Sequence, residues 1–155
     1  RHISQVVAVG TSLLLAGESG TLARSDDGGA TWVALTSPYQ GSFFGALAVK
    51  DGSVLVFGMR GNVYRTLDLG ATWQKVETGT TVSFMSGQQL ADGRVMLVGN
   101  SGLIAESADG GQSFVLHTAK PGKGLAALVE KPGGGILFAG ESGVTPLDPA
   151  WLKGQ

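Results

Sequence analysis

Cysteine is absent from this chain of 155 residues. Its absence excludes disulfide bonds, thiolate-bound metal sites and a cysteine nucleophile. Histidine is scarce: His2 and His117 have no paired spacing, so the sequence shows neither a metal-binding pattern nor a Ser-His-Asp arrangement. The phosphate-binding pattern GxxxxGK(S/T) is also missing. We therefore expect no bound metal and no cofactor.

Charge and long apolar runs are scarce as well. Charged residues make up 15% of the chain and the net charge is −1, which favours neither a nucleic-acid partner nor an anionic membrane surface. Apolar runs such as 13–16 and 54–57 are far shorter than a membrane-spanning helix requires, so no membrane span is expected. No window shows the i, i+3, i+4, i+7 apolar stripe of an amphipathic helix. Hydrophobic residues still make up 43% of the chain, so the composition favours a folded core over disorder.

One stretch is present three times. RSDDGGATW at 24–32 returns as RTLDLGATW at 65–73 and as ESADGGQSF at 106–114, with the pattern Ser/Thr-x-Asp-x-Gly-x-Thr/Ser-Trp/Phe. The anchor residues of the three copies are Ser25, Asp27, Gly29, Thr31 and Trp32; Thr66, Asp68, Gly70, Thr72 and Trp73; and Ser107, Asp109, Gly111, Ser113 and Phe114. Their spacing is constant, 66 − 25 = 41 and 107 − 66 = 41. Such a regular interval indicates repeated supersecondary units.

A second marker keeps the same period. Gly-x-x-Gly occurs at 17–20, 58–61, 99–102 and 140–143, again 41 residues apart. Within each unit, short apolar segments alternate with turn signals such as Asp51-Gly52 and Asp92-Gly93. In the second unit we predict strands at 44–49, 54–58, 62–65 and 72–76. In the fourth unit, 148–151 reads DPAW where the Asp-containing turn is expected, so its fourth strand is predicted to be missing or degenerate.

Four-stranded units of about 40 residues predict an all-β fold, a β-propeller or part of one, with four-stranded antiparallel blades. The predicted blades are blade 1 at about 4–36, blade 2 at about 43–77, blade 3 at about 83–118 and an incomplete blade 4 at about 124–153. The alternatives are a β-sandwich, which needs no equal repeats, and a β-solenoid, which usually has shorter ones.

The repeated turn resembles the Asp-box, also called the bacterial neuraminidase repeat, which occurs in sialidases and many other propellers. Together with the Gly-x-x-Gly turn and the arginine before the box (Arg24 and Arg65), it is similar to propellers of the photosystem II assembly and stability factor type. Glu106 and Leu147 depart from that pattern at the arginine position. The resemblance covers all four units. It implies a non-enzymatic, assembly-factor-like scaffold that binds a protein partner, in an extracytoplasmic or periplasmic setting.

We predict that the box is a structural turn. Its aspartate can accept hydrogen bonds from backbone N–H groups a few residues on, and its aromatic residue is expected to pack between blades. The adjacent carboxylates of Asp26 and Asp27 suggest calcium binding or catalysis instead. The other copies have Leu67 and Ala108 in place of Asp26, and a feature built into every unit is normally scaffold.

The resemblance also implies an alternative function, a glycan-binding or sialidase-related glycoside hydrolase module. That chemistry needs a positioned carboxylate pair, or a tyrosine nucleophile with a partner glutamate and an arginine cluster. Only Tyr39 and Tyr64 are present, and Tyr64 occupies a regular strand position. We therefore predict that the protein is not an enzyme.

Arginine supplies the candidate partner-binding site. Arg24 and Arg65 occupy equivalent positions of adjacent units, and we expect them on one rim, with Arg60 on a neighbouring turn. Together they would form a basic patch for an acidic peptide or protein surface. In the alternative interpretation, each arginine pairs with a nearby carboxylate or is simply solvated.

Closure of the ring is open to three interpretations. Propellers avoid exposed sheet edges by closing. In the first, an N-terminal segment outside this chain supplies the missing blades and the final strand. In the second, two copies form one ring as a homodimer. In the third, four blades close alone. We favour the first two, because an open half-ring exposes apolar faces.

Overall fold

The computed structural model describes residues 1–153 and confirms the predicted all-β fold. Its strands are β1 (Ile3–Val9), β2 (Ser12–Gly17), β3 (Leu22–Ser25), β4 (Val33–Ala34), β5 (Phe43–Ala48), β6 (Val54–Gly58), β7 (Val63–Thr66), β8 (Gln74–Val76), β9 (Phe84–Gln89), β10 (Val95–Gly99), β11 (Leu103–Ser107), β12 (Val115–Thr118), β13 (Leu125–Glu130), β14 (Ile136–Gly140) and β15 (Gly143–Pro146). Four single-turn 3₁₀ helices accompany them: η1 (Glu18–Gly20), η2 (Met59–Gly61), η3 (Asn100–Gly102) and η4 (Pro149–Leu152).

The strands form four antiparallel sheets, each in the order of the chain. The first sheet is β1-β2-β3-β4, the second β5-β6-β7-β8, the third β9-β10-β11-β12 and the fourth β13-β14-β15. Neighbouring sheets contact each other mainly through their first strands, β1 with β5, β5 with β9 and β9 with β13. The first strands are therefore the inner strands of the blades, and the later strands extend outward, as in a β-propeller.

The hydrophobic core lies between the sheets rather than within one of them. Ala16 and Leu22 of the first sheet pack with Val56 of the second. Leu55 and Phe57 of the second sheet pack with Leu97 and Leu103 of the third. A third cluster joins the third and fourth sheets. Each sheet is thus buried by its neighbours, which is the physical reason for the repeat.

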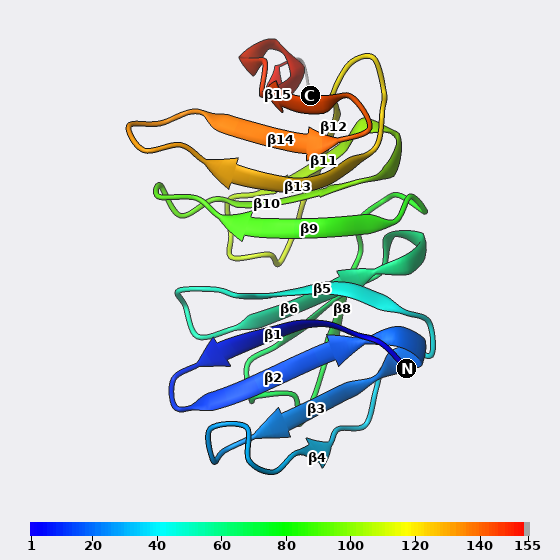
Figure 1. Cartoon of the computed structure of the whole chain (residues 1–155), viewed down its shortest axis with the longest axis vertical. Coiled ribbons are helices and arrows are strands. Elements are labelled where there is room, and N and C mark those ends of the chain that lie inside the picture. The colour runs from blue at the N-terminus through cyan, green and yellow to red at the C-terminus, as the bar shows by residue number, and fades with distance from the viewer. Residues whose placement is uncertain (154–155) are drawn as a thin grey trace.

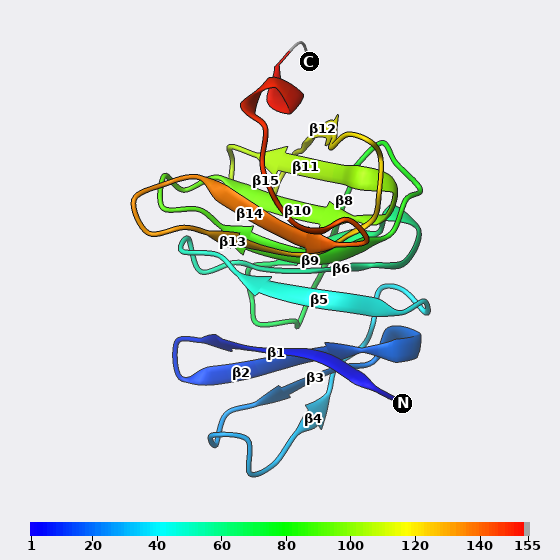
Figure 2. The same ribbon diagram turned by 45° about the horizontal axis from the view of Figure 1, so that its top comes forward.

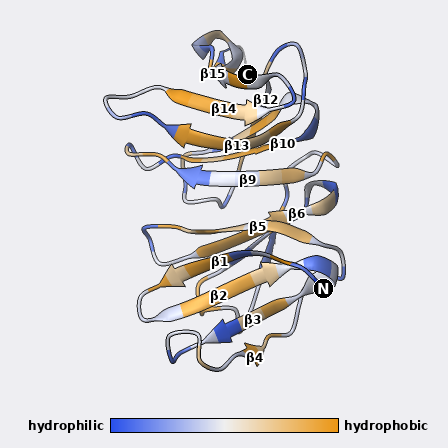
Figure 3. Ribbon diagram, viewed as in Figure 1, coloured by the Kyte–Doolittle hydropathy of each residue, from blue (hydrophilic) through white to orange (hydrophobic). Residues whose placement is uncertain are grey.

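The four sheets form an open stack. The first and fourth sheets lie at opposite ends of the molecule in both views (Figures 1 and 2). Four blades therefore do not close alone, and that interpretation of the sequence is wrong. The apolar colouring reaches both end sheets (Figure 3).

The fourth sheet stops at three strands for a local reason. Pro146 stands 41 residues after Ala105, which pairs with Leu116 of the fourth strand in the third sheet. The N–H of Leu147 donates to the oxygen of Ile136 in β14, so the nitrogen of Pro146 faces the opposite side, where a fourth strand would lie. Proline has no N–H to donate to such a strand. Trp151 of η4 instead packs on the core between the third and fourth sheets.

The first glycine of each Gly-x-x-Gly turn is required by a close backbone approach. At Gly58 the backbone is extended (φ 171°), and an added Cβ would lie 2.5 Å from the carbonyl oxygen of Ser42. Positive φ in these turns falls on the second glycine and, in the first three turns, also on the residue before it, for example Gly61 and Arg60. Within residues 1–153, no helix is long and apolar enough to cross a membrane.

Candidate functional site

The three Asp-containing turns have one hydrogen-bond pattern. In the first, a carboxylate oxygen of Asp27 accepts the N–H of Thr31 at 2.8 Å, and the other accepts the Thr31 hydroxyl at 2.5 Å. The Ser25 hydroxyl donates to Asp27 and accepts the N–H of Gly29. Thr66, Asp68, Gly70 and Thr72 repeat the pattern, as do Ser107, Asp109, Gly111 and Ser113. The turn is therefore closed by its own side chains.

These hydrogen bonds hold the aspartates ionised. Donation from the hydroxyl of the threonine four residues on is the main cause that lowers the pKa of Asp27, and likewise of Asp68, to about 2. Burial raises the pKa of Asp109, but hydrogen bonds from Ser113 and Ser107 outweigh it, and the pKa is again about 2. A general acid needs a proton near neutral pH, so these three carboxylates are unsuited to that role.

The second and third of these turns also pack against the preceding sheet. A Cβ added to Gly70 would lie 2.5 Å from Leu35 of the first sheet, and one added to Gly111 would lie 2.6 Å from Leu55 of the second. Trp73 packs on the core shared with the first sheet, and Phe114 on the core shared with the second. Trp32 has no preceding sheet and is 37% exposed.

Carboxylates elsewhere are also occupied by the scaffold. Of the 12 aspartates and glutamates, ten accept a hydrogen bond within residues 1–153, which leaves 12 − 10 = 2, Glu77 and Glu141. The ten acceptors are Glu18, Asp26, Asp27, Asp51, Asp68, Asp92, Glu106, Asp109, Glu130 and Asp148. In this part of the chain no three Asp, Glu or His side chains form a group suited to a metal ion.

The structure does not bring the three predicted arginines together. Arg60 lies in η2, at the end of β6 opposite to the Asp-containing turn, so it is not beside the other two. Arg65 is 8% exposed, and it donates to Asp51 at 2.8 Å and to the carbonyl oxygen of Gly110 in the next sheet. Arg65 therefore joins the second and third sheets and is not presented to a partner.

Arg24 is the accessible member of the set. Its side chain is 31% exposed and is paired with Asp26 at 2.8 Å. Asp26 also accepts a hydrogen bond from the Ser12 hydroxyl. This hydrogen bond is the largest cause that lowers the pKa of Asp26, and the hydrogen bond from Arg24 is the second. Arg24 lines an open groove of about 450 Å³ with Asp26, Asp27, Thr31, Val33 and Leu35, and Val33 is 68% exposed. This groove, which we call the Arg24 groove, places a cation beside the exposed side chain of Val33, and its two carboxylates already accept hydrogen bonds within the first sheet.

A charged chain in the third sheet was missed by sequence reasoning. Arg94 donates to Asp92 at 2.8 Å and to Glu106, and Glu106 lies 3.5 Å from Nε2 of His117. His117 is 3% exposed, and among the described residues neither ring nitrogen has a hydrogen-bond partner. Glu106 replaces the arginine of the first two repeats, and Arg94 stands where they have Ser12 and Ser53, so these two departures from the repeat were the available signal.

Two inter-sheet contacts were also missed, although they keep the period. Gln89 accepts the N–H of Lys50 at 2.8 Å, and 41 residues later Glu130 accepts the N–H of Ala91 at 2.8 Å. Each ties the end of one inner strand to the preceding hairpin.

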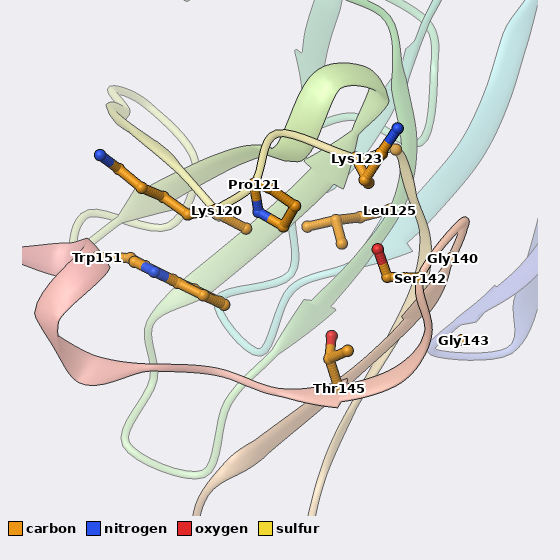
Figure 4. A pocket seen from close by; sticks show the side chains of 11 residues that line it. Lys120, Pro121, Lys123, Leu125, Gly140, Ser142, Gly143, Thr145 and Trp151 are labelled. Atoms are coloured by element: carbon orange, nitrogen blue, oxygen red, sulfur yellow. The ribbon is translucent and has the colours of Figure 1, made fainter.

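A smaller cavity lies between the third and fourth sheets. Its volume is about 50 Å³, and its lining includes Lys120, Lys123, Ser142 and Trp151. Figure 4 shows the amino groups of Lys120 and Lys123 pointing in different directions. The two cations therefore do not converge on one ligand, and the volume is that of a few waters.

Comparison with known proteins agrees with the fold. No protein-family model and no curated protein matches the chain. The structure is similar to "YCF48 bound to D1 peptide" (TM-score 0.69, 21% identity, 94% of this chain and 48% of that one). It is similar to YCF48 from Cyanidioschyzon merolae (0.68, 17%, 94% and 53%) and to virginiamycin B lyase from Staphylococcus aureus (0.76, 13%, 94% and 55%). The chain therefore spans about half the length of these solved structures, and the likeness establishes the β-propeller fold.

Proposed function

We propose that this protein is a non-enzymatic propeller scaffold that binds a protein partner through the Arg24 groove. The observation that carries the proposal is the exposed side chain of Val33 beside Arg24. An apolar surface next to a cation fits an extended segment that alternates apolar and acidic side chains. Arg24 must then exchange Asp26 for a carboxylate of the partner.

The comparisons support this proposal at the level of scaffold type. One similar structure is described as YCF48 bound to D1 peptide, so a propeller of this shape can present a peptide-binding surface. Fold alone does not carry function, and virginiamycin B lyase shares the fold. The Arg24 groove is therefore the basis of the proposal for this chain.

The use of carboxylates by the scaffold favours binding over catalysis. A glycosidase needs two carboxyl groups facing a sugar, one of them with a raised pKa. Here, ten of the carboxylates accept hydrogen bonds within the scaffold. A catalytic acid requires a raised pKa, whereas the pKa is lowered at six aspartates: Asp26, Asp27, Asp51, Asp68, Asp92 and Asp109.

We also propose that the three turns are Asp-boxes of the bacterial neuraminidase repeat type. The shared hydrogen-bond pattern of Asp27, Asp68 and Asp109 supports this assignment. The resemblance to assembly-factor propellers further supports an extracytoplasmic or periplasmic setting, which fractionation of the native host would test.

The binding proposal is tested with a fluorescein-labelled peptide of about ten residues that alternates glutamate with valine. We expect fluorescence anisotropy to give a dissociation constant in the micromolar range, about −8 kcal/mol. Arg24→Glu is expected to weaken binding at least about tenfold, or roughly 1.4 kcal/mol, because it replaces attraction by repulsion.

Arg60→Glu is the matched control, since it makes the same charge change at the opposite end of the strands. It is expected to leave the dissociation constant within about twofold. Equal losses in both variants would show a non-specific charge effect and would contradict the proposal. Release of fluorophore from 4-methylumbelliferyl glycosides by the unmodified protein would favour the glycosidase alternative instead.

A further inference from the structure

The fourth sheet presents one face that no other sheet covers. Val129 pairs with Leu137, Ala127 pairs with Ala139, and Ala139 pairs with Val144 on its other side, so these five side chains share a face. Val129 and Val144 are 51% and 70% exposed. An apolar cavity of about 180 Å³ lies on this face, which we call the C-face. Figure 3 shows β13 and β14 as strongly hydrophobic at this end of the molecule.

The first sheet presents an uncovered face at the other end. Val6 pairs with Leu15, and Ala8 with Leu13, and these four side chains make up what we call the N-face. Val6 is 46% exposed. Arg24 pairs with Leu14, on the opposite side of the sheet, so the Arg24 groove is not part of the N-face.

The repeat shows what normally covers a C-face. Leu137 occupies the position of Leu14, Leu55 and Met96, because 14 + 41 = 55, 55 + 41 = 96 and 96 + 41 = 137. The three earlier side chains are 2%, 0% and 0% exposed, whereas Leu137 is only partly buried. Leu55 is covered by the Asp-containing turn of the following sheet, at Gly111.

The same comparison shows what normally covers an N-face. Leu15 occupies the position of Val56, Leu97 and Phe138, which are 1%, 0% and 1% exposed because the preceding sheet covers them. The turn of the first sheet has no such neighbour: within 4 Å, a Cβ on Gly29 would meet only Leu13 and Trp32 of its own sheet. The chain thus has one uncovered C-face and one uncovered N-face.

We propose that the C-face binds the N-face of a second copy of this chain, head to tail, so that two copies complete a ring. In this arrangement Gly29 and Trp32 of one copy cover Leu137 of the other, as Gly111 covers Leu55 within the chain. Neither face carries a charged side chain among the residues that define it. One copy spans about half of the YCF48 and virginiamycin B lyase structures, so two copies supply about one such ring.

The proposal is tested by the molar mass of the unmodified chain in sedimentation equilibrium. We expect a concentration-dependent rise from 15.8 kDa toward 2 × 15.8 = 31.6 kDa. A constant 15.8 kDa up to about 100 μM would overturn the proposal.

Two charge insertions separate head-to-tail from other association. Val129→Arg disables the C-face and Val6→Arg the N-face, and both side chains are about half exposed, so the monomers should fold. Each variant alone is expected to stay monomeric. An equimolar mixture is expected to form a 1:1 complex, because one intact C-face and one intact N-face remain.

Leu67→Arg is the matched control, since Leu67 is 70% exposed and lies on neither face. It is expected to associate as the unmodified chain does. A dimer of Val6→Arg alone would show pairing of two C-faces and would overturn the head-to-tail arrangement. Circular dichroism and melting curves verify that each variant retains the all-β fold. If both variants are folded and their equimolar mixture stays monomeric, the head-to-tail arrangement is also overturned.

Discussion

Leu55 in the second sheet and Leu137 in the fourth occupy the same position of the repeat, yet their surroundings differ. Leu55 is fully buried, because the Asp-containing turn of the third sheet packs on it. Leu137 pairs with Val129 and Pro146 within its own sheet, has no following sheet, and lines an apolar cavity at the surface. The comparison teaches that a repeat specifies the shape of a blade, while burial and stability come from the blades on either side.

The arginines of the first two sheets show the same effect for a charged residue. Arg65 donates to Asp51 and to Gly110 of the following sheet, and is 8% exposed. Arg24 pairs with Asp26 in its own sheet, and its side chain remains 31% exposed. An identical position in the repeat therefore yields a structural residue in one sheet and an accessible residue in the other.

The largest difference is expected between Leu55→Ala and Leu137→Ala. Leu55→Ala removes a buried side chain and leaves a cavity between two sheets, which should lower the free energy of unfolding by about 2–5 kcal/mol. Leu137→Ala should lower it by less than about 1 kcal/mol, because solvent already reaches that side chain. Urea denaturation at protein concentrations low enough for a monomer measures both. Equal losses would contradict the distinction between covered and uncovered sheets.

A smaller difference is expected between Arg65→Ala and Arg24→Ala. Loss of Arg65 removes the donor to Oδ2 of Asp51 and to the Gly110 carbonyl oxygen, and should destabilise the fold by about 1–3 kcal/mol. Loss of Arg24 should change the stability by less than about 0.5 kcal/mol, since exposed ion pairs contribute little. Urea denaturation measures both losses of stability. A larger loss in Arg24→Ala than in Arg65→Ala would contradict the assignment of Arg65 as the structural residue and Arg24 as the accessible one.

The smallest difference is expected between the end and middle turns under acid. The pKa of Asp27 and that of Asp68 are both about 2 in the folded chain, below the usual 3.8. Their stabilising contribution is therefore fully present above about pH 4 and is lost as the pH falls through about 2. We expect the melting temperature to fall over that range, and Asp27→Asn and Asp68→Asn to reduce the fall by similar amounts. A fall that is unchanged in both variants would contradict the role of these carboxylates.

Much of the fold could be predicted from the sequence, because the signals were periodic. The 41-residue spacing of the Asp-containing turns and of the Gly-x-x-Gly turns predicted the strand succession, and the structure confirms the all-β propeller fold. The missing fourth strand of the last unit was visible in the loss of the turn pattern after Leu147, although the role of Pro146 became clear only from the register.

The candidate site was harder to predict, because it depends on which end of a strand a turn occupies and on what the next sheet covers. Arg60 and Arg65 are five residues apart in sequence, but Arg60 lies in the turn between β6 and β7, whereas Arg65 lies toward the other end of β7. The burial of Arg65 required the position of Gly110, 45 residues away. Neither fact is contained in the local pattern.

The burial of a sheet by its neighbours is tested most directly by comparing Trp32 with Trp73, the same residue of the turn in an end sheet and in a middle sheet. Single-tryptophan variants that retain one of them, with the other tryptophans replaced by phenylalanine, are measured by acrylamide quenching over a range of protein concentrations. We expect Trp32 to be quenched more strongly than Trp73 in dilute protein and to become protected as the concentration rises, while Trp73 stays protected throughout. Equal quenching of Trp32 and Trp73 at every concentration would contradict the idea that neighbouring sheets determine which side chains are buried.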